Sequence, residues 1–74
     1  MLGQEWLEID SVKLIDYIWN RKLTERDVAN YLKISVADLY NKIYIYKHFS
    51  RKEVHELEEL LELSKVEREL IFKM

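Results

Sequence analysis

The 74-residue sequence contains no cysteine, no proline and a single glycine, Gly3. Without cysteine, neither a disulfide framework nor a thiolate metal site can form, and two histidines are too few for most metal sites. We therefore expect no metal and no cofactor. Tight hairpins between strands usually need a residue that tolerates positive φ, most often glycine. Because no glycine follows residue 3, and because Leu, Glu and Lys favour helices, the composition predicts an all-α fold.

The chain also lacks an apolar run near the length of about 18 residues that a membrane-spanning helix needs. Its first ten residues, MLGQEWLEID, have neither the basic nor the apolar region of a secretory signal peptide. These absences predict a cytoplasmic protein with no membrane association. A chain this short buries only about 60–65% of its unfolded surface, so we expect one small domain over residues 1–74.

Charge is distributed unevenly along the chain, although the net charge is only −2. Residues 20–52 carry eight basic and three acidic side chains, a net +5, whereas residues 1–19 are −3 and residues 53–74 are −4. A basic middle between acidic ends is a candidate surface for a polyanion such as DNA.

Four hydroxyl residues are each followed, three positions later, by an acid. In a capping box the hydroxyl accepts a hydrogen bond from the amide of the acidic residue, and the acid accepts one from the amide of the hydroxyl residue. The acid also lies at the positive end of the helix dipole. The pattern predicts four helix starts, at Thr24-x-x-Asp27, Ser35-x-x-Asp38, Ser50-x-x-Glu53 and Ser64-x-x-Glu67.

Apolar residues recur at the i, i+3, i+4 spacing of amphipathic helices. They predict five helices, at about residues 11–22, 25–32, 36–45, 51–62 and 65–73. On this pattern Trp19 belongs to the core. The apolar residues near the two ends either close that core or form a partner surface; they are Leu2, Trp6, Leu7, Phe72 and Met74.

The second and third predicted helices are joined by a few residues around Lys33, which is the arrangement of a helix-turn-helix unit. The stretch KLTERDVANYLKISVADLYNKI resembles the helix-turn-helix of the lambda-repressor-like (Cro/repressor, XRE-type) family, with Ala29 as the small packing residue. The resemblance covers about residues 12–72. It is closest to the small genetic-switch proteins of temperate phages of Gram-positive bacteria. It implies a single five-helix, all-α, lambda-repressor-like domain in the cytoplasm of a bacterial host cell.

The resemblance implies a transcriptional regulator that binds double-stranded operator DNA, with the third helix in the major groove. Asn41 could contact adenine, and the basic residues could contact phosphates. A homodimer would suit two half-sites on DNA. The DNA-binding candidates are Val36, Ala37, Tyr40, Asn41, Lys42, Tyr44, Lys47, His48, Arg51 and Lys52, with Arg21, Lys22 and Arg26 as further backbone contacts.

The same face supports an alternative partner. The first exposed residues of a DNA-reading helix usually form hydrogen bonds, whereas here they are Val36 and Ala37. Glu25 and Asp38 add acidic groups, which repel phosphates and attract the arginines of another protein. The alternative is an antirepressor or modulator that binds the DNA-binding domain of a phage repressor through Glu25, Val36, Ala37, Asp38 and Tyr40. A third reading is an oligomerising piece of a larger assembly.

Catalytic chemistry has little support in the sequence. The acid-rich segment KEVHELEELLEL fits a solvated helix face. The sequence shows no nucleophile with its base and no phosphate-binding loop, so we predict that the protein is not an enzyme and has no small-molecule substrate.

Overall fold

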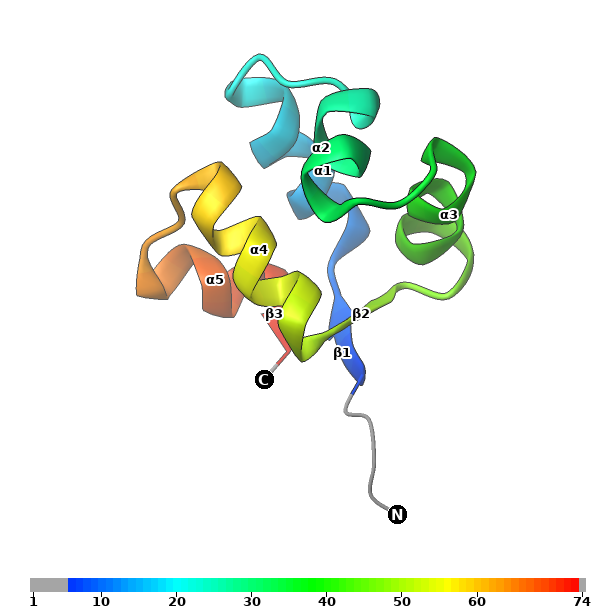
Figure 1. Cartoon of the computed structure of the whole chain (residues 1–74). Coiled ribbons are helices and arrows are strands. Elements are labelled where there is room, and N and C mark those ends of the chain that lie inside the picture. Colours follow the sequence, from blue (N-terminus) through cyan, green and yellow to red (C-terminus); the bar gives the residue numbers. More distant parts are fainter. Residues whose placement is uncertain (1–5, 74) are drawn as a thin grey trace.

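The computed structural model describes residues 6–73 and combines helices with a small antiparallel sheet (Figure 1). Five α-helices, one π-helical turn and three strands lie within these residues. In chain order they are β1 (Trp6–Ile9), α1 (Ser11–Asn20), α2 (Glu25–Leu32), α3 (Val36–Tyr40), the π-helical turn η1 (Asn41–Ile45), β2 (His48–Ser50), α4 (Arg51–Leu61), α5 (Lys65–Ile71) and β3 (Phe72–Lys73).

Strand β1 is the centre of the sheet, whose order is β2-β1-β3. Both neighbours run antiparallel to it, with Leu7 opposite Phe49 and Ile9 opposite Phe72. Side chains alternate between the two faces of a strand. Ile9, Phe49 and Phe72 are therefore buried toward the helices, while Trp6 is half exposed. The sheet fixes both ends of the described chain against the same core.

The predicted all-α, five-helix, lambda-repressor-like domain is wrong, because the sheet is an integral part of the structure. Glycine is needed where consecutive strands are joined by a tight turn. Here β1 reaches β2 through α1, α2, α3 and η1, and β2 reaches β3 through α4 and α5. No hairpin turn is required, so the scarcity of glycine does not exclude a sheet.

A single apolar core collects side chains from both the sheet and the helices. Phe72 is fully buried and Leu7 packs against the core. Of the two roles predicted for the apolar residues near the chain ends, these two residues therefore close the core. Leu2 and Met74 lie outside the described residues. The buried residues are Ile9, Leu14, Ile18, Val28, Ala29, Leu32, Leu39, Ile43, Phe49, Val54, Leu57, Leu61, Ile71 and Phe72.

Helix α1 is rotated from the orientation that its apolar spacing predicts. It buries Leu14 and Ile18, whereas Val12 is 72% and Trp19 70% exposed. The assignment of Trp19 to the core is therefore wrong. The helix carries a wider apolar stripe than a core of this size can cover, and α1 buries only the part that faces the remaining elements.

The chain turns at helix ends without using glycine. Lys22, Lys33, Lys47 and Glu62 adopt left-handed backbone conformations with φ between 52° and 60°. Each such residue costs about 1–2 kcal/mol relative to its ordinary conformation. At Lys33 and Glu62 the backbone amide donates to carbonyl groups of the last helical turn, which offsets part of this cost.

Within residues 6–73, no helix is both long enough and apolar enough to cross a membrane.

Because Phe72 is buried, a mutation at this residue tests the position of β3. We expect Phe72→Ala to lower the free energy of unfolding by about 3–5 kcal/mol, because it leaves a cavity in the core. Val66→Ala, at a 65% exposed position on α5, should change it by no more than about 0.5 kcal/mol. Urea unfolding followed by circular dichroism measures both. Equal losses for the two variants would contradict the position of β3.

Candidate macromolecular interface

A sharp turn between α2 and α3 presents the start of α3 to solvent. Helix α2 ends at Leu32, Lys33 takes the left-handed conformation, and the Ile34 amide donates to the Ala29 carbonyl at 3.0 Å. Ser35 then caps α3 by accepting from the Asp38 amide at 3.0 Å. Three residues thus separate the two helices, and the first turn of α3 is exposed.

The π-helical turn η1 continues α3 with wider winding. Its hydrogen bond from the Tyr46 amide to the Asn41 carbonyl, at 2.8 Å, closes an i→i+5 turn. Leu39 and Ile43 remain in the core. Tyr40 and Tyr44 lie together at the surface, with ring centroids 4.7 Å apart. The predicted third helix, residues 36–45, is therefore one continuous run with two kinds of winding.

Tyr44 connects this run to the start of α2. Its hydroxyl donates to Glu25 Oε2 at 3.5 Å. Partial burial, followed by the negative charge of Glu25, raises the pKa of Tyr44 above its ordinary value, so the hydroxyl keeps the proton that it donates. We call the surface formed by Glu25, Val36, Ala37, Asp38, Tyr40 and Tyr44 the α3 face.

The α3 face contains an acid that its helix cap does not use. Three of the four predicted capping boxes are complete, at Thr24, Ser50 and Ser64. Ser35 makes only half of its box, because the Asp38 carboxylate does not accept from the Ser35 amide. Among the described residues, no hydrogen bond or ion pair engages that carboxylate, so it is a free negative charge at the start of α3.

Two of the predicted phosphate-contacting cations are engaged within the protein. Lys42 Nζ lies 3.2 Å from Glu53 Oε2, with the side chains 19% and 14% exposed, and it also lies over the Trp6 ring. Arg21 Nε donates to the Leu61 carbonyl. A phosphate would have to compete with these contacts for Lys42 and Arg21.

The remaining DNA-binding candidates are spread over several elements and do not form one group on α3. His48 lies on β2, half buried, with its ring centroid 4.6 Å from Trp6 and 5.7 Å from Tyr46. Asn41 is half buried at the start of η1. The exposed cations of the basic segment are Lys22, Arg26, Lys33, Lys47, Arg51 and Lys52.

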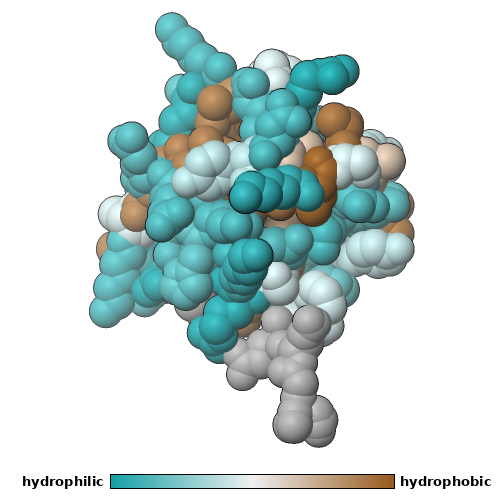
Figure 2. Space-filling model, in the orientation of Figure 1, coloured by the Kyte–Doolittle hydropathy of each residue, from teal (hydrophilic) through white to brown (hydrophobic). Residues whose placement is uncertain are grey.

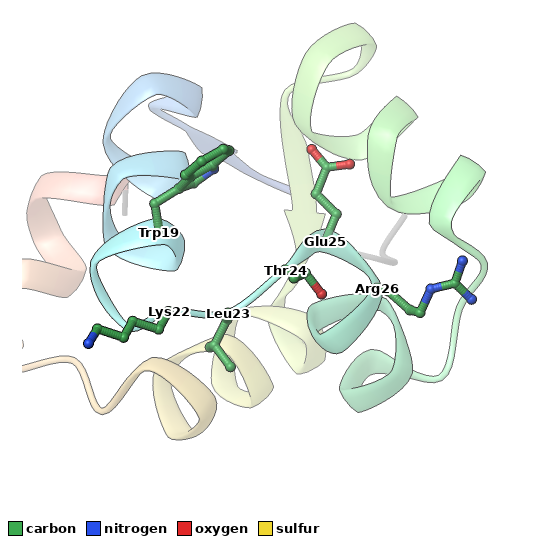
Figure 3. A pocket seen from close by; sticks show the side chains of 6 residues that line it. All are labelled: Trp19, Lys22, Leu23, Thr24, Glu25 and Arg26. Atoms are coloured by element: carbon green, nitrogen blue, oxygen red, sulfur yellow. The ribbon is translucent and has the colours of Figure 1, made fainter.

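Two shallow hollows border Tyr44 and Glu25. One, of about 410 Å³, is lined by Ser11, Val12, Ile15, Asp16, Tyr44 and Lys47. The other, of about 530 Å³, is lined by Trp19, Lys22, Leu23, Thr24, Glu25 and Arg26 (Figure 3). On the side of the molecule seen in Figure 2, apolar side chains reach the surface between hydrophilic ones. Within residues 6–73, no group of three or more histidine or acidic side chains could hold a metal ion.

Comparisons with protein-family models, with curated proteins and with solved structures found no match. A function must therefore be inferred from the chemistry of the α3 face and its surroundings.

The complete capping box at Thr24 predicts that the stability of the fold depends on pH. The Thr24 amide, followed by the Thr24 hydroxyl, lowers the pKa of Asp27. A carboxyl whose pKa falls on folding adds stability above its unfolded pKa of about 3.9, and this stability is lost as pH falls through the folded value. We expect Asp27→Ala to lower the free energy of unfolding at pH 7 and to matter progressively less below about pH 4.

The matched control for this prediction is Asp38→Ala, which removes an acid at the same position of the next helix. Because the Asp38 carboxylate makes no capping bond, its removal should lower the free energy of unfolding at pH 7 by less than Asp27→Ala does. Urea unfolding at several pH values measures both variants. An equal loss at pH 7 for the two variants would show that Asp38 completes a capping box in solution.

Proposed function

We propose that this protein regulates transcription by binding another protein, as an antirepressor-type modulator. Its α3 face would dock against the cationic DNA-reading surface of a phage repressor, in the cytoplasm of the bacterial host, and block access to DNA. The observation that carries the proposal is the free Asp38 carboxylate at the exposed start of α3, beside the apolar Val36 and Ala37.

Electrostatics favours a cationic partner for this face. Groups at the start of a DNA-reading helix lie close to phosphates and base edges. Asp38 would place negative charge at that position, and Glu25 adds a second carboxylate held by Tyr44. Against a basic protein surface the same two charges attract, guide the encounter and select the partner.

The uncharged part of the α3 face has the composition of an interface centre. Tyr40 is 51% exposed and packs against Tyr44 with the two rings tilted, and Val36 lies one turn before Tyr40. Protein interfaces are enriched in tyrosine and depleted of charge at their centre. Tyrosine also supplies a large contact area at a low cost in conformational entropy. This mode of action needs neither a cofactor nor a catalytic group.

Reversal of the charge at Asp38 tests the proposal. We expect Asp38→Lys to raise the Kd for the DNA-binding domain of the switch repressor by roughly tenfold or more, because attraction becomes repulsion. Isothermal titration calorimetry measures the affinity. Glu69→Lys makes the same change at an exposed position on α5 and should leave the Kd within about twofold. An unchanged affinity for Asp38→Lys would count against the proposed docking face.

Binding to operator DNA is the second candidate function. The net charge of +5 over residues 20–52 favours it, as do the exposed side chains of Arg26, Lys47 and Lys52. In this mode α3 enters the major groove and Asn41 reads a base. Each phosphate that is neutralised releases counterions, so affinity must fall steeply as salt rises.

A salt titration separates the second candidate from the first. If the protein binds operator DNA, Lys47→Glu should weaken binding to all sequences alike, whereas Asn41→Ala should change sequence preference. Lys65→Glu, on α5, is the matched control and should have little effect. Fluorescence anisotropy with a promoter fragment at two salt concentrations provides the measurement. Absent or salt-insensitive binding excludes the second candidate.

A further inference from the structure

We propose that the hollow between α1 and α2 receives an arginine side chain of the protein partner. The guanidinium would stack on the Trp19 ring and pair with the Glu25 carboxylate. This inference rests on the proposed function, since it names the chemical group that the α3 face recognises at its edge. It adds Trp19, which lies outside the α3 face, to the binding surface.

The arrangement of side chains leaves the hollow open to a ligand. In Figure 3, Trp19 and Glu25 extend on the same side of the segment that joins the two helices, while Lys22 and Arg26 point away in opposite directions. Thr24 is occupied in its capping box with Asp27. The volume of about 530 Å³ lies within the range of about 300–1,000 Å³ that ligand pockets span.

Trp19 differs from the other aromatic residues that are suited to bind a cation. Arg21 lies over the Tyr17 ring at 5.2 Å, and Lys42 lies over the Trp6 ring at 5.5 Å. Among the described residues, no lysine or arginine lies over Trp19, although its side chain is 70% exposed. Indole is the strongest cation–π partner among the side chains, so an exposed and unoccupied one fits an external cation.

Glu25 provides a positioned carboxylate beside this ring. Its Oε2 accepts from Tyr44, and within residues 6–73 no cation lies within ion-pair distance of it. A guanidinium is planar, so it can stack on indole while its edge donates two hydrogen bonds to a carboxylate. The ammonium group of lysine has no such plane. The pairing of indole with carboxylate therefore selects arginine over lysine.

The hollow is continuous with the α3 face. Tyr44 contacts Glu25 on one side and lines the neighbouring hollow with Val12 and Ile15 on the other. The exposed residues of α1 thus adjoin the tyrosine pair. A partner seated on the α3 face would bring its peripheral arginines within reach of Trp19.

A peptide titration tests the hollow without the repressor. In a Trp6→Phe background Trp19 is the only tryptophan, so its fluorescence reports on the site. A hexa-arginine peptide should change the emission saturably and bind at least about threefold more tightly than hexa-lysine. Hexa-citrulline, which is uncharged, should produce no saturable change.

The same titration with two variants tests the carboxylate. Glu25→Gln should weaken the binding of the arginine peptide about fivefold or more, and Glu69→Gln should leave it unchanged. Equal responses to arginine and citrulline, or equal effects of the two glutamine variants, would overturn the inference.

A second titration uses the DNA-binding domain of the switch repressor with Trp19→Ala, Glu25→Gln and the double variant. If both residues hold the same arginine, the fold-loss of affinity in the double variant should be smaller than the product of the two single fold-losses. That result supports the inference. If Asp38→Lys weakens binding to the repressor domain but neither of these variants does, the arginine site is wrong and the proposed function stands. If the repressor domain does not bind while the arginine peptide does, the proposed function fails and the site stands.

Discussion

The pairing of β1 with two distant strands is the constraint on which the rest of the structure depends. β1 binds β2 along one edge and β3 along the other, and both neighbours directly adjoin helices. Phe49 and Phe72 are thereby held in the core beside Ile9. Because α4 starts where β2 ends and α5 ends where β3 starts, the sheet positions both helices.

The residues that α3 and η1 bury determine which of their side chains form the exposed α3 face. Leu39 and Ile43 anchor α3 and η1, so the opposite side of that run, with Tyr40 and Tyr44, must face outward. The hydrogen bond from Tyr44 to Glu25 links that run to α2, and the hollow beside Glu25 links it to α1. Lys42 is turned to Glu53 instead. The resulting α3 face combines two tyrosines with two carboxylates, and this combination suits a basic protein better than a phosphate backbone.

The local structure could be predicted from sequence and the long-range structure could not. Capping residues and apolar periodicity act within a few residues, so they place the helices to within about two residues at each end, which is the usual precision of such boundaries. The strands depend on pairing between residues such as Leu7 and Phe49, for which the sequence contains no turn signal. Trp19 was misassigned because its spacing matched a core position, whereas α1 buries Leu14 and Ile18 and leaves Trp19 exposed. Within the candidate site, Val36, Ala37 and Tyr40 could be proposed from the sequence, but the unused Asp38 carboxylate and the Lys42–Glu53 pair are visible only in the structure.

The most direct test of the central claim is to map the binding surface by NMR. Uniformly ¹⁵N-labelled protein would be titrated with the unlabelled DNA-binding domain of the switch repressor. We predict that amide chemical-shift changes concentrate at the α3 face and extend to Trp19; the affected residues should be Glu25, Val36, Ala37, Asp38, Tyr40 and Trp19. Changes confined to the surface around Lys47 and Lys52, or a complete absence of changes at saturating concentration, would contradict it.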